Sequence, residues 1–173
     1  MKITTTAKPL NAPRLLVLNL SLVAVSLLIL APQSARASIE TPFHANFVTQ
    51  FTATLEFPIL YVTVNGKGNA TYMGTTTAST DDQVSNLIDG SGSATYTLTA
   101  DNGDTLTLAL AVQPGGTLNV EGGVTFSGTY TVVRGTGRFR KNTGSGVFAG
   151  SALFLNPTEG IGSFSLVGLL ITR

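Results

Sequence analysis

The chain has 173 residues, a formal net charge of +1 and no cysteine. A chain without cysteine has no disulfides, no thiol catalysis and no thiolate metal sites. Its basic residues do not form a patch interleaved with aromatic ones, so the sequence argues against a nucleic-acid partner.

Residues 1–37 have the three parts of a secretory signal peptide. A basic start precedes an apolar run over residues 15–30, and small side chains flank the arginine of residues 35–37. We predict cleavage after Ala37, which leaves one domain over residues 38–173 and a secreted or periplasmic protein. The alternative is an uncleaved membrane anchor, but the apolar run is shorter than the roughly 20 residues that cross a bilayer.

Cleavage would change the charge balance of the chain. The leader holds Lys2, Lys8, Arg14 and Arg36, so six of the ten basic residues and all nine acidic ones remain, a formal charge of −3. No span of membrane-crossing length remains either. The remaining chain is long enough for one domain with a hydrophobic core.

The first half of this domain alternates apolar and polar residues, as strands do. Residues 47–56 alternate clearly, and residues 60–64 lead into the glycine-rich stretch 65–74, with 75–79 as a continuation. Residues 80–91 are rich in aspartate and are predicted as a loop with at most one helical turn.

The clearest prediction is a hairpin formed by residues 94–100 and 105–112. Both segments alternate strictly, with threonines on one face of each. Asn102 and Gly103 lie between them, and this pair favours a type I′ turn because both central residues need positive φ.

Three strands follow. Residues 124–132 place apolar side chains on one face, whereas 147–155 and 161–172 are apolar on both faces, which predicts burial on both sides. Turns are expected at 114–116 and 156–157. Seven or eight short strands suggest a barrel or a sandwich. We favour a closed, eight-stranded antiparallel barrel because the chain has few charges or prolines to protect open sheet edges.

One local motif stands out at residues 135–139, Gly-Thr-Gly-Arg-Phe. Its two glycines permit a tight turn between strands. Phe139 is expected to cap one end of the barrel while the neighbouring cations stay solvated. An anion site is the alternative, because the segment is rich in arginine and lysine, but the Gly-Thr-Gly sequence has no following helix and is no phosphate loop.

This motif and the later stretch 143–146, Thr-Gly-Ser-Gly, resemble the allene oxide cyclase and dirigent barrels and their secreted bacterial relatives. That superfamily has a second leading glycine where this chain has Arg134. Residues 66–74 are also similar to an early strand of the bacterial group. The resemblance implies a calycin-like, eight-stranded barrel that can enclose an apolar small molecule. Some members are trimeric, so a homo-oligomer is among the implied partners.

The resemblance carries over no catalytic residue, because only the glycine turn aligns. His44 is the single histidine and lies close to the predicted cleavage site, where chains often fray. Aspartates at 81–82 and 101–104 lack the spacing of a calcium loop. Gly144-Ser145-Gly146 lacks the frame of a nucleophile elbow. The sequence therefore predicts no metal, no cofactor and no assignable catalytic group.

Four tyrosines are the candidate ligand-binding residues, because an aromatic body with a polar tip suits a pocket and can also fill a core. They are Tyr61, Tyr72, Tyr96 and Tyr130.

Three functions stay open. The first is a secreted barrel that binds an apolar molecule or has a structural role at the cell surface. The second is a cyclase-like or dirigent-like enzyme that guides a reactive intermediate sterically. The third is a small outer-membrane barrel, against which the absence of tryptophan argues. The first two depend on whether Phe126, Phe148, Phe154 and Phe164 fill the barrel interior.

Overall fold

The computed structural model describes residues 38–118 and 123–172. The predicted signal peptide lies outside the described residues, so its cleavage stays a prediction. In the part that the structure describes, no helix is long and apolar enough to cross a membrane.

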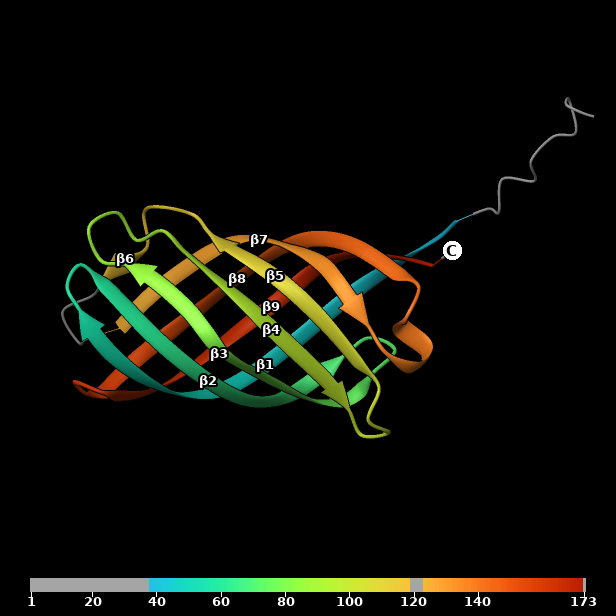
Figure 1. Cartoon of the computed structure of the whole chain (residues 1–173), viewed down its shortest axis with the longest axis horizontal. Helices are drawn as coiled ribbons and strands as arrows, with labels where there is room; N and C mark the ends of the chain where they lie inside the picture. The colour runs from blue at the N-terminus through green and yellow to red at the C-terminus, as the bar shows by residue number, and fades with distance from the viewer. Residues whose placement is uncertain (1–37, 119–122, 173) are drawn as a thin grey trace, which may run out of the picture. The chain divides into compact units, whose positions relative to one another are not determined.

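The described residues form nine strands and one 3-10 helix, η1 (Gly137–Phe139) (Figure 1). The strands are β1 (Ile39–Glu56), β2 (Ile59–Ala70), β3 (Gly74–Asn86), β4 (Gly92–Ala100), β5 (Thr105–Val112), β6 (Thr117–Leu118), β7 (Gly123–Gly135), β8 (Asn142–Asn156) and β9 (Glu159–Thr172).

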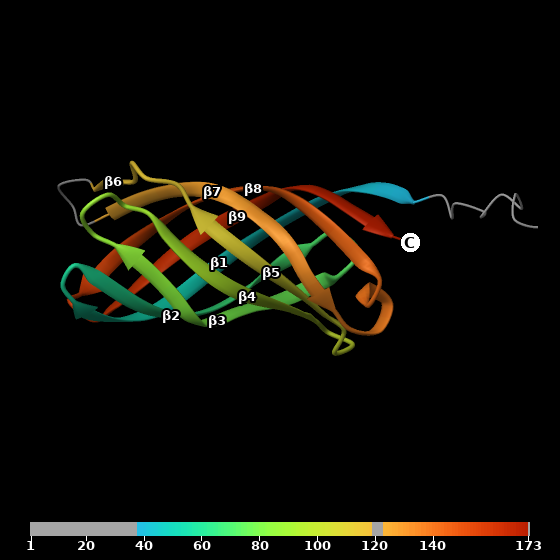
Figure 2. The same ribbon diagram turned by 45° about the horizontal axis from the view of Figure 1, so that its top comes forward.

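All strand pairs are antiparallel, in the order β5-β4-β3-β2-β1-β9-β8-β7-β6. A further pairing between β5 and β7 closes the sheet on itself. Since β6 is a two-residue strand beside the start of β7, eight strands make the barrel wall. The predicted all-β, eight-stranded antiparallel barrel is confirmed, and Figure 2 shows its wall from a second direction.

Strand β1 shows why these residues form a barrel. From Phe43 to Ala53 every second side chain is buried and every other one is exposed. This period of two places one face against the interior. The expectation that the chain frays near His44 is wrong, because His44 lies within β1. Its backbone amide donates to Thr71 Oγ1 at 3.0 Å, and its carbonyl accepts from the same hydroxyl at 2.9 Å.

The predicted hairpin is confirmed, but its turn differs from the predicted one. Strands β4 and β5 pair from Gly92 with Val112 to Thr99 with Thr105. Gly103 has a φ of +84°, and its amide donates to the carbonyl of Ala100 at 2.9 Å. Asn102 does not have positive φ, so the connection is not a type I′ turn.

Two sequence-based expectations for other strands are wrong. Residues 80–86 belong to β3, so only 87–91 form the connection to β4. Strands β8 and β9 are buried on one face only, because the barrel wall is a single layer. Their outward apolar side chains are exposed, and Val147, Leu155 and Val167 are examples.

The end of the barrel near η1 is packed solid. Phe139 is buried and caps this end, as predicted, beside fully buried Phe43, Leu106 and Leu170. Arg138 is not simply solvated, because its Nε lies 3.5 Å from Asp104 Oδ2 and its guanidinium lies over the Phe139 ring. The opposite end is built differently.

Candidate functional site: a half-open cavity in the barrel

A cavity of about 700 Å³ occupies the half of the barrel opposite η1. Residues in or next to the connections β1–β2, β3–β4, β5–β6 and β8–β9 line it. These connections lie together at the left in Figure 1. Its wall is mostly apolar and includes Val62, Val64, Leu110 and Ala152. The volume lies in the range of small-molecule sites in proteins.

Four phenylalanines were candidates to fill the barrel interior. They lie against the wall of the cavity instead. They are Phe126, Phe148, Phe154 and Phe164, and all four line the cavity. Phe164 stacks on Phe47, with ring centroids 5.0 Å apart. Phe154 meets Phe51 edge to face at 5.0 Å. Their packing against neighbouring rings leaves the centre of this half open.

Glycines opposite these rings explain how the rings fit so close to the wall. In the register of β7 and β8, Phe126 lies opposite Gly150 and Phe148 lies opposite Gly128. A Cβ atom added at Gly150 would lie 2.6 Å from the Phe126 ring, and one at Gly128 would lie 2.8 Å from the Phe148 ring. Each ring therefore covers a glycine backbone that has no side chain of its own. The alternation of large and small inward residues forms a chequerboard.

The same pairing of large inward side chains with glycines fills the other half of the barrel. Tyr130 lies opposite Gly146 and covers Gly168 on the next strand. Its side chain is 1% exposed, and its hydroxyl has no hydrogen-bond partner among the described residues. Burial raises the pKa of Tyr130 to about 12. The ring thus belongs to the packed half and not to the cavity.

A β-bulge in β3 places a polar side chain in the cavity wall. Between Thr80 and Gln83, β3 has one residue more than β2 has between Val64 and Val62. The extra residue shifts the alternation, so inward positions change from even to odd numbers, and Gln83 lines the cavity. Bulges commonly redirect a side chain in this way.

Gln83 has a fixed partner inside the barrel. The Tyr96 hydroxyl donates to Gln83 Oε1 at 3.0 Å. Burial raises the pKa of Tyr96 above its ordinary value, and the nearby negative charge of Asp82 raises it further. Tyr96 is therefore neutral near physiological pH and keeps its proton for this hydrogen bond.

Asp82 holds the bulge. Its Oδ1 accepts the Thr80 hydroxyl at 2.6 Å and the Thr95 amide at 2.7 Å. Partial burial alone would raise the pKa of Asp82, but these hydrogen bonds outweigh it and lower the pKa below its ordinary value. The carboxylate is thus ionised at neutral pH, close to the polar end of Tyr96.

The charge around the cavity is negative. Asp89 and Tyr96 are the ionisable side chains that line it among the described residues. Hydrogen bonds from the Ser91 hydroxyl and amide lower the pKa of Asp89, so it is ionised. The β7–β8 connection, whose sequence includes Arg138 and further cations, lies at the opposite end of the barrel (Figure 2).

The structure places the four candidate tyrosines in three environments. Tyr96 lines the cavity. Tyr130 lies in the packed half, as described above. Tyr61 faces outward on β2, and Tyr72 lies in the β2–β3 turn with a φ of +65°. Both are about half exposed and contribute nothing to the cavity wall. The four do not form one site, and whether any of them binds a ligand stays a prediction.

The other candidates are dispersed. Ser145 and His44 face outward from β8 and β1. The Asp104 carboxylate is engaged by Arg138 and by the Asn102 side chain at 2.9 Å. Within the described ranges, no group of three or more histidine, aspartate or glutamate side chains is placed to hold a metal ion.

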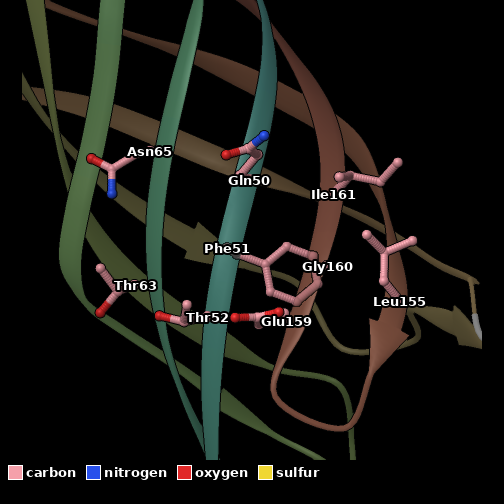
Figure 3. Close-up of a pocket in the computed structure, with 9 residues that line it drawn as sticks. All are labelled: Gln50, Phe51, Thr52, Thr63, Asn65, Leu155, Glu159, Gly160 and Ile161. Atoms are coloured by element: carbon pink, nitrogen blue, oxygen red, sulfur yellow. The ribbon is translucent and has the colours of Figure 1, made fainter.

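A second hollow, of about 390 Å³, lies at the wall formed by β1, β2, β8 and β9 (Figure 3). Outward polar side chains line it, with Gln50 and Thr52 from β1 and Thr63 and Asn65 from β2. The Phe51 ring reaches it from within because it covers Gly160. Glu159 is its one charged group. Without a partner for acid–base work, this hollow has no chemistry comparable with that of the interior cavity.

Comparisons with known proteins concern the architecture. No protein-family model and no curated protein matches the sequence. Among solved structures, the barrel is similar to that of the pterocarpan synthase dirigent protein GePTS1, at 12% identity and a TM-score of 0.45. The match covers 81% of this chain and 88% of the other. The likeness is distant and concerns the fold alone, not an activity.

Proposed function

We propose that this protein is a secreted binding protein that holds one apolar small molecule in the half-open cavity. One observation carries the proposal: a barrel with one packed end encloses about 700 Å³ of mostly apolar space at the other. Burying an apolar ligand there is favoured by roughly 25 cal/mol for each Å² of apolar surface removed from water.

The mouth suits the entry of such a molecule. Leu55 and Ile88 line it, and 56% and 73% of their surfaces are exposed. Exposed apolar groups next to a cavity are typical of ligand sites. Buried side chains such as Phe43, Leu106 and Phe139 fill the packed end, so we expect one ligand per chain.

The test is a titration of the purified protein with an environment-sensitive apolar dye. We expect saturable binding with one site per chain, and competition by other apolar compounds. Ala152→Trp places a bulky ring in the cavity and should abolish dye binding. Its matched control is Ala149→Trp on the outer face of the same strand, which should leave binding intact. Equal binding by both variants, or none by folded wild-type protein, would refute the proposal.

A second candidate function is steric guidance of a reactive intermediate inside the barrel, as in a cyclase-like or dirigent-like enzyme. The observation that favours it is the hydrogen-bonded pair of Gln83 and Tyr96, a fixed polar contact in a mostly apolar cavity. The test is the product distribution of radical or epoxide precursors with and without the protein. An unchanged distribution would leave binding as the function.

A further inference from the structure

The side-chain amide of Gln83 has hydrogen-bond donors without a partner among the residues that the structure describes. Its Oε1 accepts from Tyr96, and no residue of the described part accepts from its Nε2. A primary amide has two N–H donors. Gln83 therefore offers donors at the cavity wall, and a ligand that fills this space without an acceptor would leave them buried and unpaired, at a cost.

The charges near Gln83 decide which acceptor fits. Asp82 lies beside the Gln83–Tyr96 pair, and Asp89 lies at the mouth. No lysine or arginine of the described ranges lines the cavity. A carboxylate inside would lose its hydration next to negative charges and without a counter-ion, whereas a neutral oxygen acceptor avoids both penalties.

We propose that Gln83 is the specificity-determining polar group of the cavity, and that it selects an uncharged apolar molecule with an oxygen acceptor, such as an ester or a ketone, over a carboxylate of equal length. Tyr96 is a positioning residue that orients the Gln83 amide. This inference rests on the proposed function, because it concerns the ligand of the same cavity.

The experiment is a competition series against the apolar dye at neutral pH. The competitors are methyl decanoate, decanoate and a hydrocarbon of similar length. We expect methyl decanoate to bind about tenfold more tightly than decanoate, since an unpaired charge in an apolar site is strongly disfavoured. It should also compete better than the hydrocarbon by about three- to tenfold, the range for one neutral hydrogen bond.

Gln83→Met keeps the side-chain length and removes the amide. It should reduce the advantage of the ester over the hydrocarbon to about one, and Gln50→Met on the outer face of β1 should leave that ratio unchanged. Tyr96→Phe frees the amide and should reduce the same ratio in part. A general loss of stability lowers the affinity of all competitors and does not change the ratio, so this readout separates positioning from structural support.

The outcomes distinguish this inference from the proposed function. If neither dye nor competitor binds folded protein, both are refuted. If all compounds bind, but decanoate competes as well as its ester or Gln83→Met leaves the ratio unchanged, the inference alone is refuted and the cavity still binds apolar molecules.

Discussion

The buried hydroxyl of Tyr130 gives the sharpest test of the packed half of the barrel. An unpaired buried hydroxyl costs about 1–3 kcal/mol relative to water. Tyr130→Phe removes this group, which lies over Gly168, and keeps the ring that covers Gly146. We expect the free energy of unfolding to rise by about 1–2 kcal/mol, or roughly 3–6 °C in Tm for a domain of this size.

The assay is chemical denaturation followed by circular dichroism, with Tyr96→Phe as the matched control. Both variants remove one hydroxyl from a buried ring, but Tyr96 donates a hydrogen bond to Gln83. Its loss should lower stability by about 0.5–1.5 kcal/mol. Opposite signs for the two variants would support the structure. A Tyr130→Phe protein less stable than wild type would refute the reasoning, because the hydroxyl would then have a partner.

The pH dependence of the same variant gives an independent check. The pKa of Tyr130 is raised to about 12, compared with about 10 in an unfolded chain. Between these values the folded state keeps a proton that the unfolded state has lost, so stability falls as pH rises. The slope is about 1.4 kcal/mol per pH unit for one ring. The advantage of Tyr130→Phe should therefore grow above about pH 10.

Three further outcomes are expected. Terminal sequencing of the exported protein should find Ser38 first, and an intact Met1 would refute the predicted cleavage. Gly150→Ala should lower stability by about 1–3 kcal/mol, because its Cβ would lie 2.6 Å from the Phe126 ring and from a backbone oxygen of β9; unchanged denaturation would contradict the chequerboard. Asp82→Asn should be less stable than wild type at neutral pH. The difference should begin to shrink as pH falls below about 4, the ordinary value for an aspartate, and should vanish only below the lowered pKa of Asp82, where the folded wild-type carboxyl is protonated too. A difference that persists in acid would show that charge at Asp82 is not what holds the bulge.

The barrel itself was predictable because most strands keep a strict period of two. The segment around Asp82 was not, for a physical reason. Consecutive polar residues at 81–83 look like a loop, and the bulge shifts the alternation so that Gln83 and Thr80 both face inward. The one indication in the sequence is Val84, a β-branched residue directly after the polar run.

The sequence alone could not decide whether the barrel interior is open or filled. The inward phenylalanines are visible in the sequence, and their number alone suggests a filled core. Whether each ring faces a glycine depends on the register between strands, as for Phe126 with Gly150. Strands β7 and β8 follow each other in the chain, and their register is set by the connection between them together with closure of the whole barrel. The same holds for Tyr61, whose outward direction follows from the register of β2.

The chequerboard of rings and glycines has a consequence for how this barrel can diverge. A side chain acquired at Gly150 is tolerable only if the ring at Phe126 is lost or shortened, so the two positions should change together in descendants of this sequence. Each such exchange moves bulk from one strand to its neighbour with little change in total volume. The lineage can therefore reshape its cavity in small, paired steps and keep the same barrel throughout.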